Sequence, residues 1–145
     1  MFEVPEATPM ADKSMKYKII VDLSKGSVKP DSVNDGIEKL ARLVNMHLDA
    51  GIPKENLDVV GVFHFLGTPN IMTDEAYKKK FGINNPNTLI INELAKHGVK
   101  FYVCGQSLRA RKLTDEPRNE NIKVALSAML TFSTLQGKGY SMILP

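Results

Sequence analysis

The sequence contains very little cysteine: Cys104 is the only one among 145 residues. A single cysteine cannot form a disulfide within the chain, so the fold must be stabilised by its hydrophobic core. Cysteine content therefore does not decide between an oxidising and a reducing cellular compartment. No apolar run approaches the roughly 20 residues that span a bilayer, and the start of the chain lacks the basic and then apolar order of a signal peptide. We therefore expect a soluble protein without membrane contact, cytoplasmic, or periplasmic if a leader has been removed.

An excess of one charge and the usual cofactor motifs are also missing. The net charge is only +3, and the lysines and arginines are dispersed, which argues against nucleic acid as a partner. The glycines form no dinucleotide or nucleoside triphosphate motif, and the loop at 24–27 is too short a signal to favour a flavin phosphate. The potential metal ligands His47, His64, His97 and Cys104 show no paired spacing. We expect neither a metal nor an organic cofactor.

What the chain does contain is enough apolar sequence for one domain. With 145 residues, 43% of them hydrophobic, it can bury roughly two-thirds of its unfolded surface. Residues 1–15 are rich in Pro, Glu and Ala without periodicity, which indicates an N-terminal arm. Residues 16–145 are expected to form a single domain.

Strand and helix signals alternate along that domain. Apolar, β-branched runs predict strands at 17–23, 57–65, 99–104, 122–126 and 140–144. Helical spacing and cap residues predict helices from a capping box at 32–35 to Gly51, from Thr73 to Phe81, from Asn85-Pro86 to His97, over 106–112, and from Ser127 to Gln136. This order predicts a three-layer α/β/α domain with a mostly parallel sheet of about five strands, a flavodoxin-like layering.

Cys104 is the strongest functional candidate because it lies where a strand passes into a helix. The amides of Gln106 and Ser107 and the helix dipole would stabilise its thiolate, and Gly105 has no side chain to block a donor sulfur. Arg109 adds positive charge that could attract an anionic sulfur species or an acidic partner. The alternative is structural, since free cysteines are among the most buried residues and often act as small hydrophobes.

The sequence also predicts which segments surround this cysteine. In parallel sheets, ligands gather at the carboxyl ends of the strands, so 24–27, 64–68 and 104–107 should share one edge. His64 lies in this set and could accept, donate or orient a proton near the thiol. A histidine at such a position is more often a hydrogen-bonded core residue, and the sequence singles out no Asp or Asn as its partner.

Several motifs together resemble the DsrE/DsrF-like family over about residues 17–144. They lie at 73–82, 85–87, 93–99, 103–108, 124–129, 134–136 and 139–140, and Cys104-Gly-Gln-Ser-Leu108 in this order of elements is fairly specific. The chain departs from the family where relatives have His-Gly at the end of the second strand, because here His64 and Gly67 are separated by two residues. It also has Arg111-Lys112 where many relatives have Arg-Gly.

The resemblance implies a compact α/β domain that assembles as a homo-oligomer, such as a trimer or hexamer. Some relatives belong to sulfur relays, in which the cysteine matching Cys104 accepts sulfur as a persulfide and passes it to a partner; others have no assigned activity. Our first hypothesis is therefore a sulfur-trafficking protein with donor and acceptor proteins as partners, at most a sulfurtransferase. The alternative is a non-catalytic, oligomeric ligand-binding or scaffold subunit in which Cys104 is structural.

Overall fold

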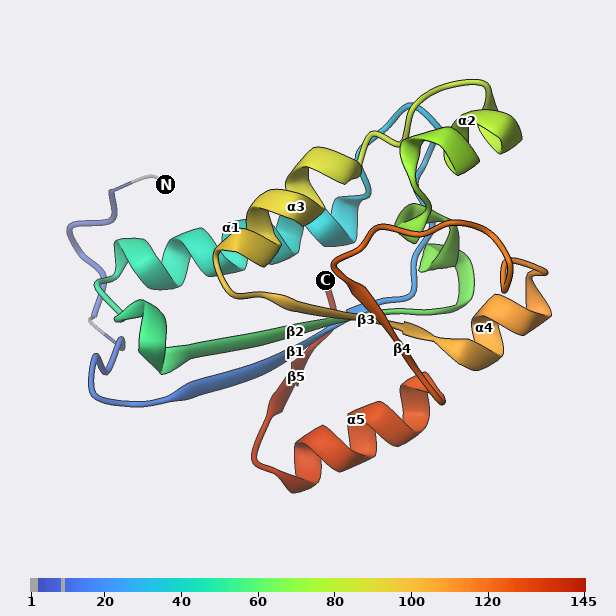
Figure 1. Cartoon of the computed structure of the whole chain (residues 1–145). Coiled ribbons are helices and arrows are strands. Elements are labelled where there is room, and N and C mark those ends of the chain that lie inside the picture. Colours follow the sequence, from blue (N-terminus) through green and yellow to red (C-terminus); the bar gives the residue numbers. More distant parts are fainter. Residues whose placement is uncertain (1–2, 9) are drawn as a thin grey trace.

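Five parallel strands form the sheet in the computed structural model, which describes residues 3–8 and 10–145 (Figure 1). Their order across the sheet is β4-β3-β2-β1-β5. The strands are β1 (Tyr17–Leu23), β2 (Leu57–Phe63), β3 (Lys100–Cys104), β4 (Ile122–Ala125) and β5 (Ser141–Ile143). The predicted α/β class with a parallel sheet is therefore confirmed, and every strand pairing is parallel.

The helices follow the predicted order, with local differences. They are α1 (Asp35–Asp49), α2 (Asp74–Phe81), α3 (Thr88–Lys96), α4 (Gly105–Ala110) and α5 (Ala128–Gly137), with short 3-10 helices at Lys54–Asn56 and Phe65–Ile71. The predicted caps Thr73 and Ser127 accept hydrogen bonds from backbone amides at the starts of α2 and α5. Of the predicted arm, residues 1, 2 and 9 lie outside the described residues, and the described part forms no helix or strand.

Several predicted boundaries were wrong by one to three residues. The second strand ends at Phe63, because Phe65 has a φ of 48°, which is incompatible with extended backbone. The cap of α1 is Asn34 rather than Ser32, and its side chain accepts from the amides of Gly36 and Ile37. The helix expected from Asn85-Pro86 begins at Thr88.

The handedness of the crossovers explains how the helices are distributed. The chain moves across the sheet in one direction from β1 through β2 and β3, so right-handed crossovers place α1 and α3 on the same face. The connection from β4 to β5 returns across three strands, so α5 lies on the opposite face (Figure 1). One face is therefore covered by the two helices α1 and α3, and the other by α5.

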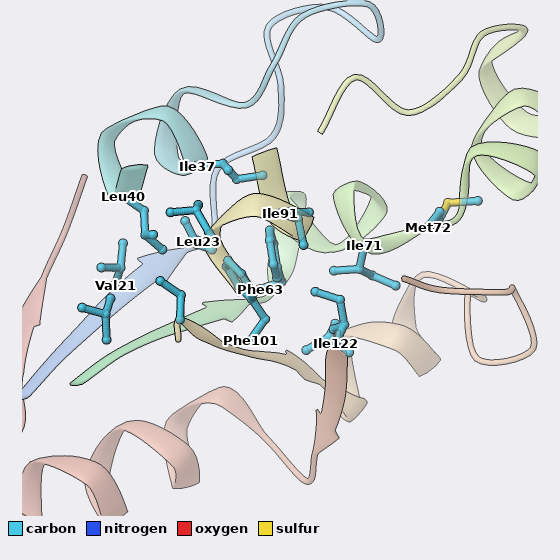
Figure 2. Close-up of a cluster of buried hydrophobic side chains, with 14 of the residues drawn as sticks. Val21, Leu23, Ile37, Leu40, Phe63, Ile71, Met72, Ile91, Phe101 and Ile122 are labelled. Carbon is cyan, nitrogen blue, oxygen red and sulfur yellow. The ribbon is translucent and has the colours of Figure 1, made fainter. Parts of the chain in front are cut away.

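The hydrophobic core reflects this asymmetry. On the α1 and α3 face, the side chains of β1, β2 and β3 pack with Ile37, Leu40 and Ile91 into one large buried cluster (Figure 2). Phe63 and Phe101 lie at its centre with their ring centroids 5.8 Å apart. The cluster on the α5 face is much smaller, with Ile20, Val60, Val62, Cys104 and Ala128 as its buried members. The site described below lies on this second face.

Gly67 holds the segment after β2 against β1. A Cβ at this position would lie 1.9 Å from the Leu23 carbonyl oxygen, so only glycine allows the two backbones to approach this closely. Its amide donates to the Ser24 carbonyl at 2.9 Å. The close contact fixes His64 and Phe65 at the carboxyl edge of the sheet.

No helix in the described part of the chain is both long enough and apolar enough to cross a bilayer.

Candidate functional site

Cys104 is the last residue of β3 and the N-cap of α4, which begins at Gly105, one residue earlier than the predicted helix. The side chain is buried, with 4% of the residue's surface exposed. In the parallel register Cys104 pairs with Ala125 of β4. The thiol therefore lies at the carboxyl edge of the sheet, on the face covered by α5.

Two helix starts direct hydrogen-bond donors at the sulfur. Burial raises the pKa of the Cys104 thiol, but hydrogen bonds from the Ser107 hydroxyl and from the amides of Ser107, Ala128 and Gln106 outweigh it, so the pKa is lowered from its ordinary value. Gln106 and Ser107 belong to α4, as expected from the sequence. The Ala128 amide comes from the first residue of α5, a contribution that the local sequence around Cys104 does not reveal.

Ser107 links the thiol to the segment after β2. Its Oγ accepts a hydrogen bond from the Phe65 amide at 3.0 Å, and the same hydroxyl group lowers the pKa of the Cys104 thiol. The Ser107 oxygen accepts from the Phe65 amide, so the single proton of the hydroxyl remains available to the Cys104 sulfur. Phe65 adopts the left-handed conformation, which is rare for a bulky residue, and its exposed ring lies under Arg111 at 5.5 Å.

Gly105 and Gln106 are both in contact with the turn between β4 and α5. A Cβ on Gly105 would lie 3.0 Å from the Ala125 carbonyl oxygen, so glycine makes room for this turn. The Gln106 side-chain amide donates to the Leu126 carbonyl at 3.3 Å. The two residues thus hold the turn beside the thiol, Gln106 through its hydrogen bond to the Leu126 carbonyl.

Arg109 is exposed on α4 and makes no ion pair with any described residue. It contributes positive charge near the carboxyl edge of the sheet without contacting the sulfur.

His64 is paired with Asp22, a residue that the sequence did not single out. The His64 Nε2 lies 2.8 Å from Asp22 Oδ1, and their side chains are 22% and 15% exposed. Since a carboxylate only accepts hydrogen bonds, Nε2 donates in this pair, and in the neutral imidazole the free lone pair is therefore on Nδ1. The ring also packs edge-on against Phe132 of α5, with centroids 5.5 Å apart.

The strand register relates this pair to the thiol. The register of β2 and β3 ends with Phe63 opposite Val103, and His64 and Cys104 are the next residues of the two chain segments at this edge. Both lie on the α5 face, where Phe132 packs against the His64 ring and against the buried cluster that contains Cys104. Asp22 is opposite Val62 on the other side of β2. The carboxyl ends of β1, β2 and β3 thus present a carboxylate, an imidazole and a thiol in one row.

The three segments expected to share this edge are brought together. Gly67 of the second segment is bonded to Ser24 of the first, and Phe65 is bonded to Ser107 of the third. The loop at 24–27 is bonded to the segment after β2 a second time, since the Ser27 hydroxyl donates to Asn70 Oδ1 at 3.0 Å. Among residues 3–8 and 10–145, no three His, Cys, Asp or Glu side chains are grouped so that they could hold a metal ion.

Comparisons with known proteins agree with the resemblance. The chain is similar in structure to MTH1491 from Methanobacterium thermoautotrophicum, a protein of unknown function, with a TM-score of 0.66 and 19% identity over 89% of this chain and 99% of that one. It is also similar to the ychN protein from E. coli, with a TM-score of 0.63 and 11% identity over the same shares of the two chains. These likenesses show the fold. A comparison with curated proteins found no match.

The model of the DsrE/DsrF-like family matches residues 19–145, which includes β1 except its first two residues, β2 through β5, and every residue of the candidate site. The chain therefore belongs to the DsrE/DsrF-like family.

Proposed function

We propose that the protein carries sulfane sulfur as a persulfide on Cys104 and passes it to a partner thiol. The observation that supports this most strongly is the set of hydrogen bonds that lowers the pKa of a thiol at the edge of the sheet. The thiolate is the nucleophile in exchange at sulfur, and a lowered pKa increases its population near neutral pH. The family includes sulfur-relay proteins, which supports the same conclusion.

The proposed reaction has two exchange steps. The Cys104 thiolate attacks the terminal sulfur of a donor persulfide, R–S–SH; a new sulfur–sulfur bond forms at Cys104, the bond in the donor breaks, and the donor leaves as the thiolate R–S⁻. An acceptor thiolate then attacks the terminal sulfur of the Cys104 persulfide, becomes R′–S–SH, and releases the Cys104 thiolate. Sulfur is moved without net oxidation, so the exchange requires no cofactor.

The neighbouring side chains have separate proposed roles. His64 accepts the thiol proton at Nδ1, and Asp22 positions the imidazole through its hydrogen bond to Nε2. Ser107 and the helix amides stabilise the anion, while Gly105 and Gln106 hold the adjacent turn in place. Exposed Arg109 attracts an anionic donor or an acidic partner surface.

A mass measurement tests the proposal. The full chain and its Cys104→Ser variant are incubated with inorganic polysulfide, and their intact masses are recorded before and after reduction. The proposal predicts a gain of one or more sulfur atoms in the wild type that is removed by reductant and absent from the variant. Slow alkylation at neutral pH together with no sulfur adduct would overturn it.

The competing account is a non-catalytic scaffold or ligand-binding subunit with a structural cysteine. The observation that favours it is the 4% exposure of Cys104. This account predicts that the thiol resists both alkylation and sulfur loading until the chain unfolds. Adding denaturant to the same measurement separates the two, because only the structural account requires unfolding for any reaction.

We also propose that the chain assembles with copies of itself, as a trimer or hexamer. Leu126, in the turn before α5, and Met129, in the first turn of α5, are large apolar residues that are 70% and 81% exposed. Sedimentation velocity should show an oligomer that Met129→Lys weakens, with Ser133→Lys on the same helix as the control. A monomer at all micromolar concentrations would contradict this proposal.

A further inference from the structure

The side of the sheet covered by α5 contains a groove that is separate from the cysteine. It measures about 330 Å³ and lies between α5 and strands β2, β3 and β4. Within the described residues, α5 alone covers this face of the sheet, whereas α1 and α3 together cover the other face, and part of the sheet beside α5 is left uncovered (Figure 1). Its apolar lining consists of Val60, Ala125, Leu130 and Leu135. This volume and lining are in the range of small-molecule sites.

The groove also contains polar groups without partners. The Tyr102 and Thr134 side chains line it, and neither hydroxyl forms a hydrogen bond with any described residue. Thr131, next to them, donates its hydroxyl proton to the Ser127 carbonyl and keeps an oxygen that can accept. A few convergent polar groups on an apolar surface are the usual means by which a pocket orients a ligand.

The charges around the groove favour an anion. Lys100 lines it, and Lys123 is opposite Tyr102 in the register, on the same face of the sheet. The carboxylate nearby, Asp58, is already engaged by Lys100 Nζ at 3.0 Å and by the Tyr140 hydroxyl. One bond to Asp58 leaves two of the three Lys100 ammonium protons for a ligand.

We propose that this groove binds a small organic anion, one with an aromatic or aliphatic body and a carboxylate or similar acidic group. The body lies on the apolar floor beside α5, the acidic group faces Lys100, and the Tyr102 hydroxyl donates to it. The site does not use Cys104, so it is independent of the sulfur chemistry proposed above.

The test compares a charged probe with a neutral one. The full chain is labelled with nitrogen-15 and titrated with phenylbutyrate and with phenylbutanol, which share a body and differ in charge. The amide signals of residues 102, 125, 131, 134 and 135 should shift and saturate with phenylbutyrate. Lys100→Gln should weaken phenylbutyrate roughly two- to fivefold, as expected for one exposed charge contact, and leave phenylbutanol unchanged.

Two matched variants locate the binding. Thr134→Trp fills the groove from its α5 wall and should abolish the shifts, whereas Ser133→Trp, one residue along the same exposed helix but outside the groove lining, should retain them. Unfolding of either variant is detected by the loss of its dispersed amide spectrum. In that event Leu130→Trp, also on the wall of the groove, replaces Thr134→Trp, and Gln136→Trp, exposed on the same helix but outside the lining, replaces Ser133→Trp.

Three results would overturn the proposal. The first is absence of saturable binding at millimolar probe, and the second is a set of shifts that is the same in Thr134→Trp. The third is a wild-type oligomer that excludes the probe and dissociates when Thr134→Trp is introduced, because that result identifies a second copy of the chain as the occupant.

Discussion

Replacing Ser107 with alanine tests how the thiol is activated. The variant removes the one side-chain donor to the Cys104 sulfur and leaves the three amide donors in place. A hydrogen bond to a charged group contributes roughly 1.5–3 kcal/mol, and about 1.4 kcal/mol corresponds to tenfold. The pKa of Cys104 should therefore rise, and alkylation at pH 7 should slow by about tenfold or more.

The assay is the rate of iodoacetamide alkylation as a function of pH, read by intact mass. The wild-type rate should reach its plateau at a lower pH than that of an ordinary thiol, and the profile of Ser107→Ala should be displaced to higher pH. Ser107→Thr keeps the hydroxyl and should restore the wild-type profile. Because the Phe65 amide that loses its acceptor is on an exposed residue that water can reach, stability should fall by less than about 1 kcal/mol.

A superimposable pH profile in Ser107→Ala, with the fold intact, would refute the reasoning. It would mean that the hydroxyl does not act on the thiolate and that the amides alone set its ionisation.

Three further predictions concern the surroundings of the thiol. Gly67→Ala should lower the free energy of unfolding measured in urea by about 3 kcal/mol or more, because its Cβ would lie 1.9 Å from a β1 carbonyl oxygen. Gly137→Ala, where a Cβ has no atom within 4 Å, should leave that free energy unchanged. Equal effects of the two variants would contradict the close contact. Asp22→Asn should slow sulfur loading of Cys104 roughly tenfold at pH 7 and leave the rate unchanged at pH 10, where the thiol ionises without a base. Equal slowing at both pH values would exclude a role of Asp22 in positioning His64. Gln106→Ala should release the turn before α5 and raise the alkylation rate, and an unchanged rate would show that this turn does not limit access to the sulfur.

Much of the fold could be predicted because its signals are local. The apolar run of β1 has the same bounds in sequence and structure, and Thr73 and Ser127 act as caps where their residue types indicate. The wrong boundaries have tertiary causes. Phe65 adopts a left-handed conformation, and its amide donates to Ser107, which is 42 residues away in the sequence. No rule based on the residue type at position 65 predicts either feature.

The candidate site was predictable only in part for the same reason. Gln106 and Ser107 are two and three residues after Cys104, so their amides could be placed from the predicted change from strand to helix at that point. Asp22 was missed because it is 42 residues from His64 and meets it only across two strands. Once β1 and β2 are recognised as parallel neighbours, the shared register is a signal that could have paired them.

The most direct test of the central claim is delivery of sulfur in a single turnover. The protein is loaded with polysulfide, freed of excess reagent, and mixed with cyanide, which converts sulfane sulfur to thiocyanate. The account predicts close to one thiocyanate per chain from the wild type, none after prior reduction, and none from Cys104→Ser. If the folded wild type released no more thiocyanate than Cys104→Ser, the account would be contradicted and Cys104 would be a structural residue.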